Sequence, residues 1–375
     1  MNKSQPKVSV LMSVYNGSQY LRESVESILN QTFTNFEFII INDCSTDKTG
    51  EILTVSANQD NRITLINNEE NIGLTRSLNK GLKIAKGEYI ARQDADDISL
   101  PERLERQVES LDKNPEAVLI SCDLDLINAK GDRVGSFRRS CDSNLVAWYL
   151  LFYNHLAGHS QVMFRRKSVL NLGGYAENYR YCQDYELWCR LVKIGRIIIR
   201  PEVLLQQRFH SQSISSDKKT EQKSYALKQV QDNICNLINR EISLKEAEKL
   251  SGFWIGHWWQ QCFPSSSEVR SINLLLQEIS KAFIQKEFQQ FSSSVVTYSQ
   301  LKNLISQQFM AWIQVPFNKR HSLKAKLRIS YYALAWSPLG VLKSWIILLW
   351  KSKSYLLKAI IRLPQNLKSE AKGCS

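Results

Sequence analysis

The chain has 375 residues, of which 43% are hydrophobic and 23% are charged. This composition is that of a globular protein and excludes disordered and collagen-like chains, and the length suits two or three domains. Eight cysteines without a C-x-x-C pair indicate reduced thiols rather than a disulfide framework, so a secreted protein is not expected.

The net charge of +13 is unevenly distributed. The first 215 residues contain equal numbers of basic and acidic side chains, whereas residues 316–375 contain 12 basic residues and 1 acidic residue. An electrically balanced part is therefore followed by a basic tail, and we expect the two parts to have different roles.

The N-terminal half alternates short apolar runs with segments of helical periodicity. This pattern predicts an α/β fold with a mostly parallel, Rossmann-like sheet and helices on both faces. The expected strands are 8–15, 36–41, 63–66 and 88–91, and the expected helices between them are 20–29, 45–55 and 74–85. Ser18 and either Ser45 or Thr46 are expected as N-caps of the first two helices, and Pro101 as the first residue of the next helix.

The pattern then becomes less regular, and beyond about residue 217 it is entirely helical. The expected strands are 117–122, 132–138, 160–165 and 197–209, with helices at 143–152, 166–172 and 184–194. Further helices are expected near 219–240, 243–261, 267–290, 297–313 and 321–361. We therefore divide the chain into an α/β domain, 1–216, an all-helical extension, 217–315, and a basic amphipathic tail, 316–375.

Polar residues follow the predicted strands at their carboxyl ends, where open α/β sheets bind ligands. Tyr15 and Asn16 follow the first strand, Asp43 follows the second, and the run Asp94-Ala-Asp-Asp97 follows the fourth. Three carboxylates within four residues repel one another unless a cation or hydrogen-bond donors hold them together. Such oxygen ligands favour Mg²⁺ or Mn²⁺, which commonly bridge a diphosphate to a protein, although a solvated helix-capping turn is the alternative.

Other candidates stand farther apart in the chain. Asp184 and Glu186 begin a predicted helix, whose dipole stabilises the carboxylate anion and keeps it available as a base. Arg76 lies on the third predicted helix, and His159 and His210 lie at the ends of apolar strands. Each has a plainer interpretation: a helix cap for the acids, a surface cation for the arginine, and a structural residue for the histidines.

Several segments, in this order, resemble the family 2 glycosyltransferases, which have the GT-A fold. They are Val8–Asn16, Ile41–Asp47, Asn71–Leu74, Ala91–Asp97 with Pro101 and Arg103–Leu104, Gly173–Tyr175 and Gln183–Trp188. The resemblance covers residues 8–216. It implies a nucleotide-sugar donor, expected to be UDP-linked, and inversion at the anomeric carbon of the transferred sugar.

The resemblance also implies roles for individual residues. Asp184 would be the general base that takes a proton from the acceptor hydroxyl. The nucleotide-sugar-binding residues would be Tyr15, Asn16, Asp43, Arg76 and Asp94, and the residues holding Mg²⁺ or Mn²⁺ would be Asp94, Asp96 and His210. Two positions depart from the family pattern: Cys44 replaces a glycine, which suggests a different turn, and Gln183 replaces a glutamate that often precedes the base.

The basic tail indicates a membrane surface. Residues 331–350 are apolar but are interrupted by Pro338, Gly340 and Lys343, which makes them a weak transmembrane candidate. Between 339 and 362, basic residues fall on one helical face and Trp and Leu residues on the other, as in helices that lie on anionic membranes. We expect peripheral membrane contact through 339–362, a cytoplasmic protein at the inner face of the cell membrane, and a glycan or lipid-linked acceptor; an ordinary helical domain is the alternative. Nucleic acid is not an expected partner, because no binding motif accompanies the charge.

The sequence thus predicts a glycosyltransferase of glycan or polysaccharide synthesis that acts by metal-assisted single displacement. A catalytically silent, membrane-associated partner with the same fold remains an alternative. A sugar nucleotidyltransferase is a weaker one, because it needs a glycine-rich basic loop after the first strand, and Val14–Gly17 is not such a loop. Dinucleotide binding is excluded by the absence of a G-x-G-x-x-G motif.

Overall fold

The computed structural model divides into two compact units. It describes residues 5–139, 142–156, 158–210, 219–255, 265–290, 296–314 and 323–342. The first unit runs to residue 236 and includes 240–247, and the second comprises 237–239 and the described residues from 248 onward.

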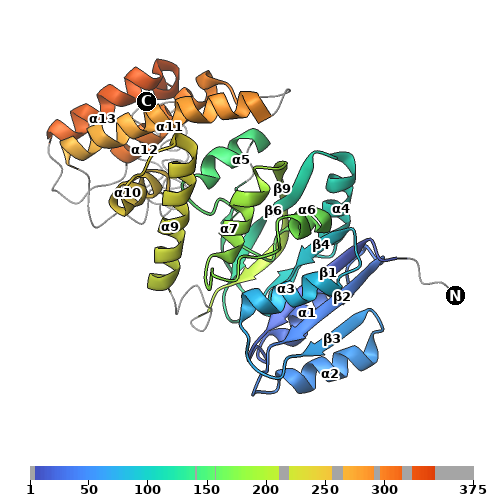
Figure 1. Ribbon diagram of the computed structural model, residues 1–375. Helices are drawn as coiled ribbons and strands as arrows, with labels where there is room; N and C mark the ends of the chain where they lie inside the picture. Colours follow the sequence, from blue (N-terminus) through green and yellow to red (C-terminus); the bar gives the residue numbers. More distant parts are fainter. Residues whose placement is uncertain are drawn as a thin grey trace, which may run out of the picture. The chain divides into compact units, whose positions relative to one another are not determined.

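The first unit is built on a mixed sheet, in which nine strands are described (Figure 1). These are β1 (Val8–Val14), β2 (Phe36–Asn42), β3 (Ile63–Asn67), β4 (Tyr89–Arg92), β5 (Ile98–Ser99), β6 (Ala117–Ile127), β7 (Arg133–Phe137), β8 (Met163–Arg165) and β9 (Arg196–Arg208). Their order is β3-β2-β1-β4-β8-β6-β9-β5, with β7 paired to β6. The first four strands are parallel, as expected, and so are β6 and β9; β8 runs antiparallel to its neighbours β4 and β6.

Helices cover both faces of this sheet, which confirms the predicted α/β class. The helices described up to residue 255 are α1 (Leu21–Leu29), α2 (Thr49–Gln59), α3 (Leu74–Ile84), α4 (Arg103–Lys113), α5 (Ser143–Leu150), α6 (Arg166–Asn171), α7 (Gln183–Leu191), α9 (Lys219–Ile238) and α10 (Leu244–Ile255). On one face, Val10 and Met12 of β1 share a core with Val25 of α1 and Leu104 of α4. Leu11 points to the other face, where α3 packs closely enough that Gly81 has no room for a side chain.

Three helices begin later than the sequence predicts. The helix α1 begins at Leu21 and α2 at Thr49, neither with a side-chain N-cap. Instead, the Ser18 N–H donates to Asp47 Oδ2 (3.1 Å), and Ser45 Oγ accepts from the Asn16 N–H (3.0 Å). The expected capping residues therefore join two neighbouring loops. Pro101 likewise lies in a turn before α4.

The second unit contains α11 (Ser266–Gln290), α12 (Tyr298–Gln314) and α13 (Leu323–Trp336). Its core includes Phe253 and Phe309, whose ring centroids are 4.8 Å apart, and Ser306 Oγ of α12 donates to the Ala333 carbonyl of α13 (2.7 Å). No helix within the described ranges is long and apolar enough to cross a membrane. The amphipathic pattern expected through residue 362 lies, beyond residue 342, outside the described residues.

Candidate active site

The loops that follow β1 and β2 are joined by Asn16. Its side-chain oxygen accepts from the Thr46 N–H (2.8 Å), and its backbone adopts a positive φ of 51°. Tyr15, the preceding residue, is 51% exposed. The structure thus uses Asn16 to fix the loop and leaves the ring of Tyr15 open to a ligand at the carboxyl edge of the sheet.

Asp43 organises the entry into α3. It is 2% exposed, and its Oδ1 accepts from Asn68 Nδ2 (2.7 Å) and the Ile72 N–H (3.0 Å). Its Oδ2 accepts from the Gly73 N–H (2.9 Å), at a glycine whose φ is 86°. Three donors therefore occupy most of the four acceptor positions of this carboxylate.

Cys44, which replaces the glycine of the family pattern, adopts a backbone conformation that favours glycine. Its φ is 60°, in the left-handed region that disfavours L side chains. The cysteine is therefore strained in this turn, and whether the turn differs from that of the family stays a prediction. Its thiol contacts the Glu69 carbonyl at 3.4 Å, which is a small compensation.

We therefore expect Cys44→Val to lower the free energy of unfolding by about 1–2 kcal/mol, because a β-branched side chain tolerates a positive φ even less. Cys44→Gly, which removes the strain, should match or exceed the wild type. Chemical denaturation of both variants measures this difference, and equal stabilities would show that the turn relaxes.

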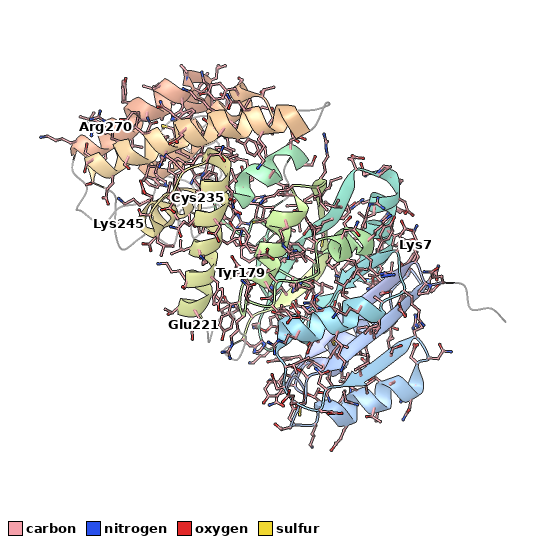
Figure 2. The ribbon with its side chains drawn as sticks, in the orientation of Figure 1. Lys7, Tyr179, Glu221, Cys235, Lys245 and Arg270 are labelled. Carbon is pink, nitrogen blue, oxygen red and sulfur yellow. The ribbon has the colours of Figure 1, made fainter. Side chains whose placement is uncertain are left out.

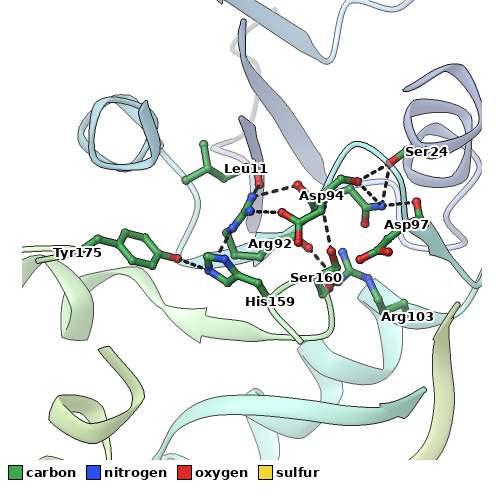
Figure 3. Close-up of polar contacts among 10 residues, drawn as sticks. Leu11, Ser24, Arg92, Asp94, Asp97, Arg103, His159, Ser160 and Tyr175 are labelled. Atoms are coloured by element: carbon green, nitrogen blue, oxygen red, sulfur yellow. Dashed lines mark hydrogen bonds and ion pairs between the residues drawn. The ribbon is translucent and has the colours of Figure 1, made fainter. Parts of the chain in front are cut away.

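The three aspartates after β4 lie in three different environments, and Figure 3 shows two of them, Asp94 and Asp97. Asp94 Oδ1 accepts from Arg92 Nη2 at 2.6 Å, and Asp96 Oδ2 lies 3.0 Å from His210 Nε2. Both side chains are about one-third exposed, at 31% and 30%. Asp97 is buried and accepts from the Arg208 N–H at 3.0 Å. Asp94 and Asp96 thus remain open to a ligand, whereas Asp97 belongs to the interior.

Burial is the main electrostatic influence on this loop. Loss of hydration, and then the charge of Asp94, raise the pKa of Asp96, while His210 partly opposes the increase. Burial and the charges of its two neighbours raise the pKa of Asp97 well above its ordinary value. A cation or a donor-rich ligand at the open carboxylates would relieve this repulsion.

Two buried arginines that are not among the predicted site residues hold the loop. Arg92 is fully buried between Asp94 and His159, whose ring nitrogen Nε2 lies 3.2 Å from Arg92 Nε. Arg208 donates from Nε to the Asp96 carbonyl (3.1 Å) and from Nη2 to Glu23 Oε2 (2.6 Å). One sequence feature could have identified Arg92: it is an arginine within an apolar strand, and an acidic cluster follows that strand directly.

His159 is a structural residue of this network rather than a ligand. Its Nε2 lies 2.8 Å from the hydroxyl of Tyr175, and burial lowers its pKa well below the ordinary value. The ring is therefore neutral, and the single lone pair of Nε2 is shared between Arg92 Nε and the Tyr175 hydroxyl.

Asp184 lies in the first turn of α7, after Cys182 with a φ of 57°. Asn154 Nδ2 donates to Asp184 Oδ2 at 2.9 Å. Burial raises the pKa of Asp184; the charge of Asp94 acts in the same direction, and hydrogen bonds from Tyr185 and Asn154 oppose it. Desolvation therefore acts against the stabilisation that the N-terminus of α7 gives to the carboxylate anion.

Glu186, the other acid of this turn, is structural. Both of its oxygens pair with Arg190 at 2.6 Å, and Arg190 in turn donates to the carbonyls of Leu172 and Gly174 at 2.8 Å. The ion pair between Glu186 and Arg190 fixes the turn before Tyr175, so Glu186 has a structural role. Of the two acids in this helical turn, Asp184 remains the candidate base.

Arg76 and the loop before α7 meet at the surface. Arg76 Nε lies 3.4 Å from Glu177 Oε2, and more than half of each side chain is exposed. The same loop is held at Tyr179 (labelled in Figure 2), whose carbonyl accepts from Thr75 Oγ1 of α3 at 3.1 Å and whose ring lies 5.7 Å from that of Tyr225 of α9. Arg76 is therefore free to exchange its surface partner for an anionic ligand.

Side chains that could bind a divalent metal are present at this edge of the sheet, but they do not form a complete metal site. No group of three or more His, Cys, Asp or Glu residues is close enough to hold a metal within the described part of the chain. Asp96 and His210 are adjacent and offer oxygen and nitrogen donors, whereas Asp94 faces Arg92. Mg²⁺ and Mn²⁺ commonly use one or two carboxylates together with substrate phosphates, so these residues fit such an ion.

Comparison with known proteins agrees with this geometry. Residues 9–171 match glycosyl transferase family 2. An uncharacterized glycosyltransferase of Haemophilus influenzae is 34% identical over 265 residues, which cover 67% of this chain and 81% of that protein. The chain is a family 2 glycosyltransferase.

This glycosyltransferase is also similar to another curated protein and to two solved structures. The putative glycosyltransferase EpsE of Bacillus subtilis is 38% identical over 196 residues, covering 51% of this chain and 69% of EpsE. Among solved structures, S. aureus TarS 1–349 in complex with UDP-GlcNAc has a TM-score of 0.54 at 14% identity, over 88% of this chain and 91% of that one. The mannosyltransferase PcManGT of Pyrobaculum calidifontis, in complex with GDP-Man and Mn²⁺, has a TM-score of 0.51 at 16% identity, over 91% and 87% of the two chains. These structures share the GT-A fold, which confirms the predicted fold.

Proposed function

We propose that this glycosyltransferase transfers a sugar from a nucleotide-diphosphate donor, UDP-linked, to a hydroxyl of a glycan or lipid-linked acceptor, with inversion. The observation that carries the proposal is the convergence of two carboxylates from distant segments. Asp94 follows β4 and Asp184 begins α7, yet the charge of Asp94 raises the pKa of Asp184, and both charges raise that of Tyr175. His159, which contacts Arg92, also has its ring centroid 5.7 Å from that of Trp188 in α7. The two carboxylates therefore stand on neighbouring elements, and we propose that they face one reaction centre.

Asp184 is proposed as the general base. An acceptor hydroxyl is a poor nucleophile at neutral pH, so removal of its proton during attack contributes about 10²–10⁴ in rate. Burial raises the pKa of Asp184 and so makes it a stronger base than an exposed aspartate. Asn154 binds Oδ2 at 2.9 Å, which orients the carboxylate. A single in-line displacement needs only this one carboxylate and gives inversion.

The leaving diphosphate is proposed to bind at Asp94, Asp96 and His210 together with Mg²⁺ or Mn²⁺. When bound, the metal supplies positive charge that neutralises the diphosphate as it leaves. Asp96 and His210 are proposed to hold it through the oxygen and nitrogen that now lie 3.0 Å apart. PcManGT, which shares the fold, was solved with Mn²⁺ and GDP-Man.

The nucleotide is proposed to lie across the loops after β1 and β2. Tyr15 offers a half-exposed ring, and Arg76 an exposed cation. Asn16 shapes the loop, and Asp43 retains about one acceptor position for a ribose hydroxyl or a base N–H. TarS, which shares the fold, was solved with UDP-GlcNAc, and a UDP donor is proposed here.

A panel of UDP- and GDP-sugars, incubated with and without Mn²⁺ or Mg²⁺, tests the proposal through release of the nucleoside diphosphate. Metal-dependent turnover of a UDP-sugar is the expected result. If no donor turns over even after membrane lipids are added, the protein is the silent partner with the same fold.

The second unit is proposed to rest on an anionic membrane, at the inner face of the cell membrane. From 327 to 342, the exposed large side chains of α13 and the residues after it are all apolar: Leu327, Tyr331, Leu334, Leu339 and Leu342. Lys324 and Lys326 stand at the start of this segment, and no acidic residue occurs between 323 and 342. An apolar face next to basic residues is the pattern of a helix that lies on anionic lipid. The segment 339–362, which the sequence predicts to contact the membrane, begins within this part of the chain.

We expect the double variant Leu327→Glu, Leu334→Glu to lose at least tenfold in binding to vesicles of anionic phospholipid, because each buried leucine contributes about 1.5–3 kcal/mol. Leu274→Glu is the matched control: this leucine is 54% exposed on α11 of the same unit. Co-sedimentation with the vesicles measures the binding of the wild type and of both variants. Equal losses in the double variant and in Leu274→Glu would mean that the membrane contact lies elsewhere. A wild type that does not bind would exclude the proposed membrane contact.

A further inference from the structure

We propose that Arg92 is the positioning residue of Asp94, and that His159 and Tyr175 hold Arg92 in place. The four side chains form a continuous line from Tyr175, through His159 and Arg92, to Asp94 (Figure 3). Arg92 and Tyr175 are almost completely buried, so the line runs through the interior and ends at the partly exposed carboxylate. The proposal rests on the proposed function in that Asp94 faces the metal and the diphosphate.

The guanidinium of Arg92 has one orientation available. Its Nη1 donates to the carbonyls of Gln93 (3.0 Å) and Leu11, and its Nε points at His159 Nε2 (3.2 Å). The remaining group, Nη2, holds Asp94 Oδ1 at 2.6 Å. Three contacts, with two carbonyls and with His159, fix the guanidinium of this buried cation. The position of Nη2, and with it the orientation of the Asp94 carboxylate, follows from these contacts.

The segment that carries His159 also holds the backbone of Asp94. Ser160 Oγ accepts from the Asp94 N–H at 2.9 Å, and the Ser160 carbonyl accepts from Nη1 of the buried Arg103. Arg103 Nη1 also donates to the Arg92 carbonyl at 3.0 Å. Residues 159 and 160 therefore position Asp94 twice, through its main chain and through the side chain of Arg92.

Tyr175 connects this line to the turn before the base helix. Its N–H donates to Asn79 Oδ1 (2.8 Å), and its carbonyl accepts from Asn79 Nδ2 (2.9 Å). The preceding Gly174 has a φ of 82° and leaves no room for a Cβ beside Asn79. This accounts for the Gly-Gly-Tyr pattern: two glycines permit the turn that aims the tyrosine hydroxyl at His159.

Groups that orient a metal-binding carboxylate commonly alter metal affinity by about 10–100-fold when removed. His159→Leu leaves Arg92 Nε without an acceptor, whereas His159→Gln retains one at nearly the same place. We expect His159→Leu to weaken Mn²⁺ binding in the presence of UDP by about 10–100-fold, and His159→Gln to remain near the wild type. Titration of the full chain, followed by the EPR signal of free Mn²⁺, measures this affinity without turnover.

If His159→Leu does not fold, two tyrosine variants can test the proposal through the same Mn²⁺-binding measurement. Tyr175→Phe removes only the hydroxyl that faces His159, and should weaken Mn²⁺–UDP binding to a smaller extent. Tyr89→Phe is its matched control, since Tyr89 is a buried tyrosine at the opposite end of β4 whose hydroxyl bonds Asp112 at 2.5 Å. This control should lose stability alone.

Three results would overturn the proposal. Folded His159→Leu could bind Mn²⁺–UDP like the wild type; the leucine and glutamine variants could be equally weakened; or the two tyrosine variants could be indistinguishable. Absence of Mn²⁺–UDP binding by the wild type is a separate outcome, which removes the proposed metal role and this proposal together.

Discussion

Asp184→Asn is expected to lower kcat by about 10²–10⁴ and to leave the KM of the donor nearly unchanged. The amide cannot take the proton of the acceptor hydroxyl, but it has the shape of the carboxyl group and can still accept the hydrogen bond from Asn154. Steady-state kinetics with saturating metal measures both parameters. A donor KM that rises with little change in kcat would assign Asp184 to donor binding instead.

The same carboxylate determines the acid limb of the pH profile. Asp184 must be ionised to act as a base, and burial raises its pKa above the usual 3.8. The activity should therefore fall as the pH decreases through this raised pKa, at a higher pH than an exposed aspartate would give.

Stability should change in the opposite direction to activity. Because the folded pKa of Asp184 lies above the unfolded one, the native state binds the proton more tightly, and ionisation above the folded pKa costs stability. Asp184→Asn should therefore be at least as stable as the wild type at neutral pH. Glu186→Gln, in the same helical turn, is the matched control: it breaks the 2.6 Å pair with Arg190, so it should lower Tm while each folded molecule remains active.

The parts of this fold that the sequence predicts are those with regular spacing. The parallel strands β1 to β4 and helices α1 and α3 are long enough for alternating or helical apolar patterns to appear. The two-residue strand β5 is too short for any period and is not predicted, whereas the predicted strand 160–165 is reduced to the three residues of β8. Both depend on pairing, β5 with β9 and β8 with β4 and β6. Tertiary pairing, rather than local preference, forms these strands.

The residues of the candidate site likewise fall into those that the sequence predicts and those that only the tertiary structure identifies. Asp94, Asp96 and Asp184 are recognisable because their motifs are contiguous in the chain. Arg92 and Arg208 were missed because charged residues are expected at the surface, and their burial depends on partners up to 185 residues away, such as Glu23 for Arg208. The raised pKa of Asp184 likewise depends on how deeply α7 is buried, which its sequence does not reveal.

Asp96→Ala is expected to lower kcat/KM by about 10²–10³ and to raise the Mn²⁺ concentration needed for half-maximal activity. The substitution removes the oxygen that lies 3.0 Å from His210 Nε2 and is open to the proposed metal and diphosphate.

Asp97→Asn is the control, because it changes the neighbouring carboxyl group and leaves the Asp96 oxygen in place. Asp97 is buried and accepts from the Arg208 N–H, a bond that an asparagine oxygen can replace, so most of the activity should remain. Equal losses in the two variants would mean that the loop acts through its fold. A loss confined to Asp96→Ala, relieved by high Mn²⁺, would assign the metal contact to Asp96 and the structural role to Asp97.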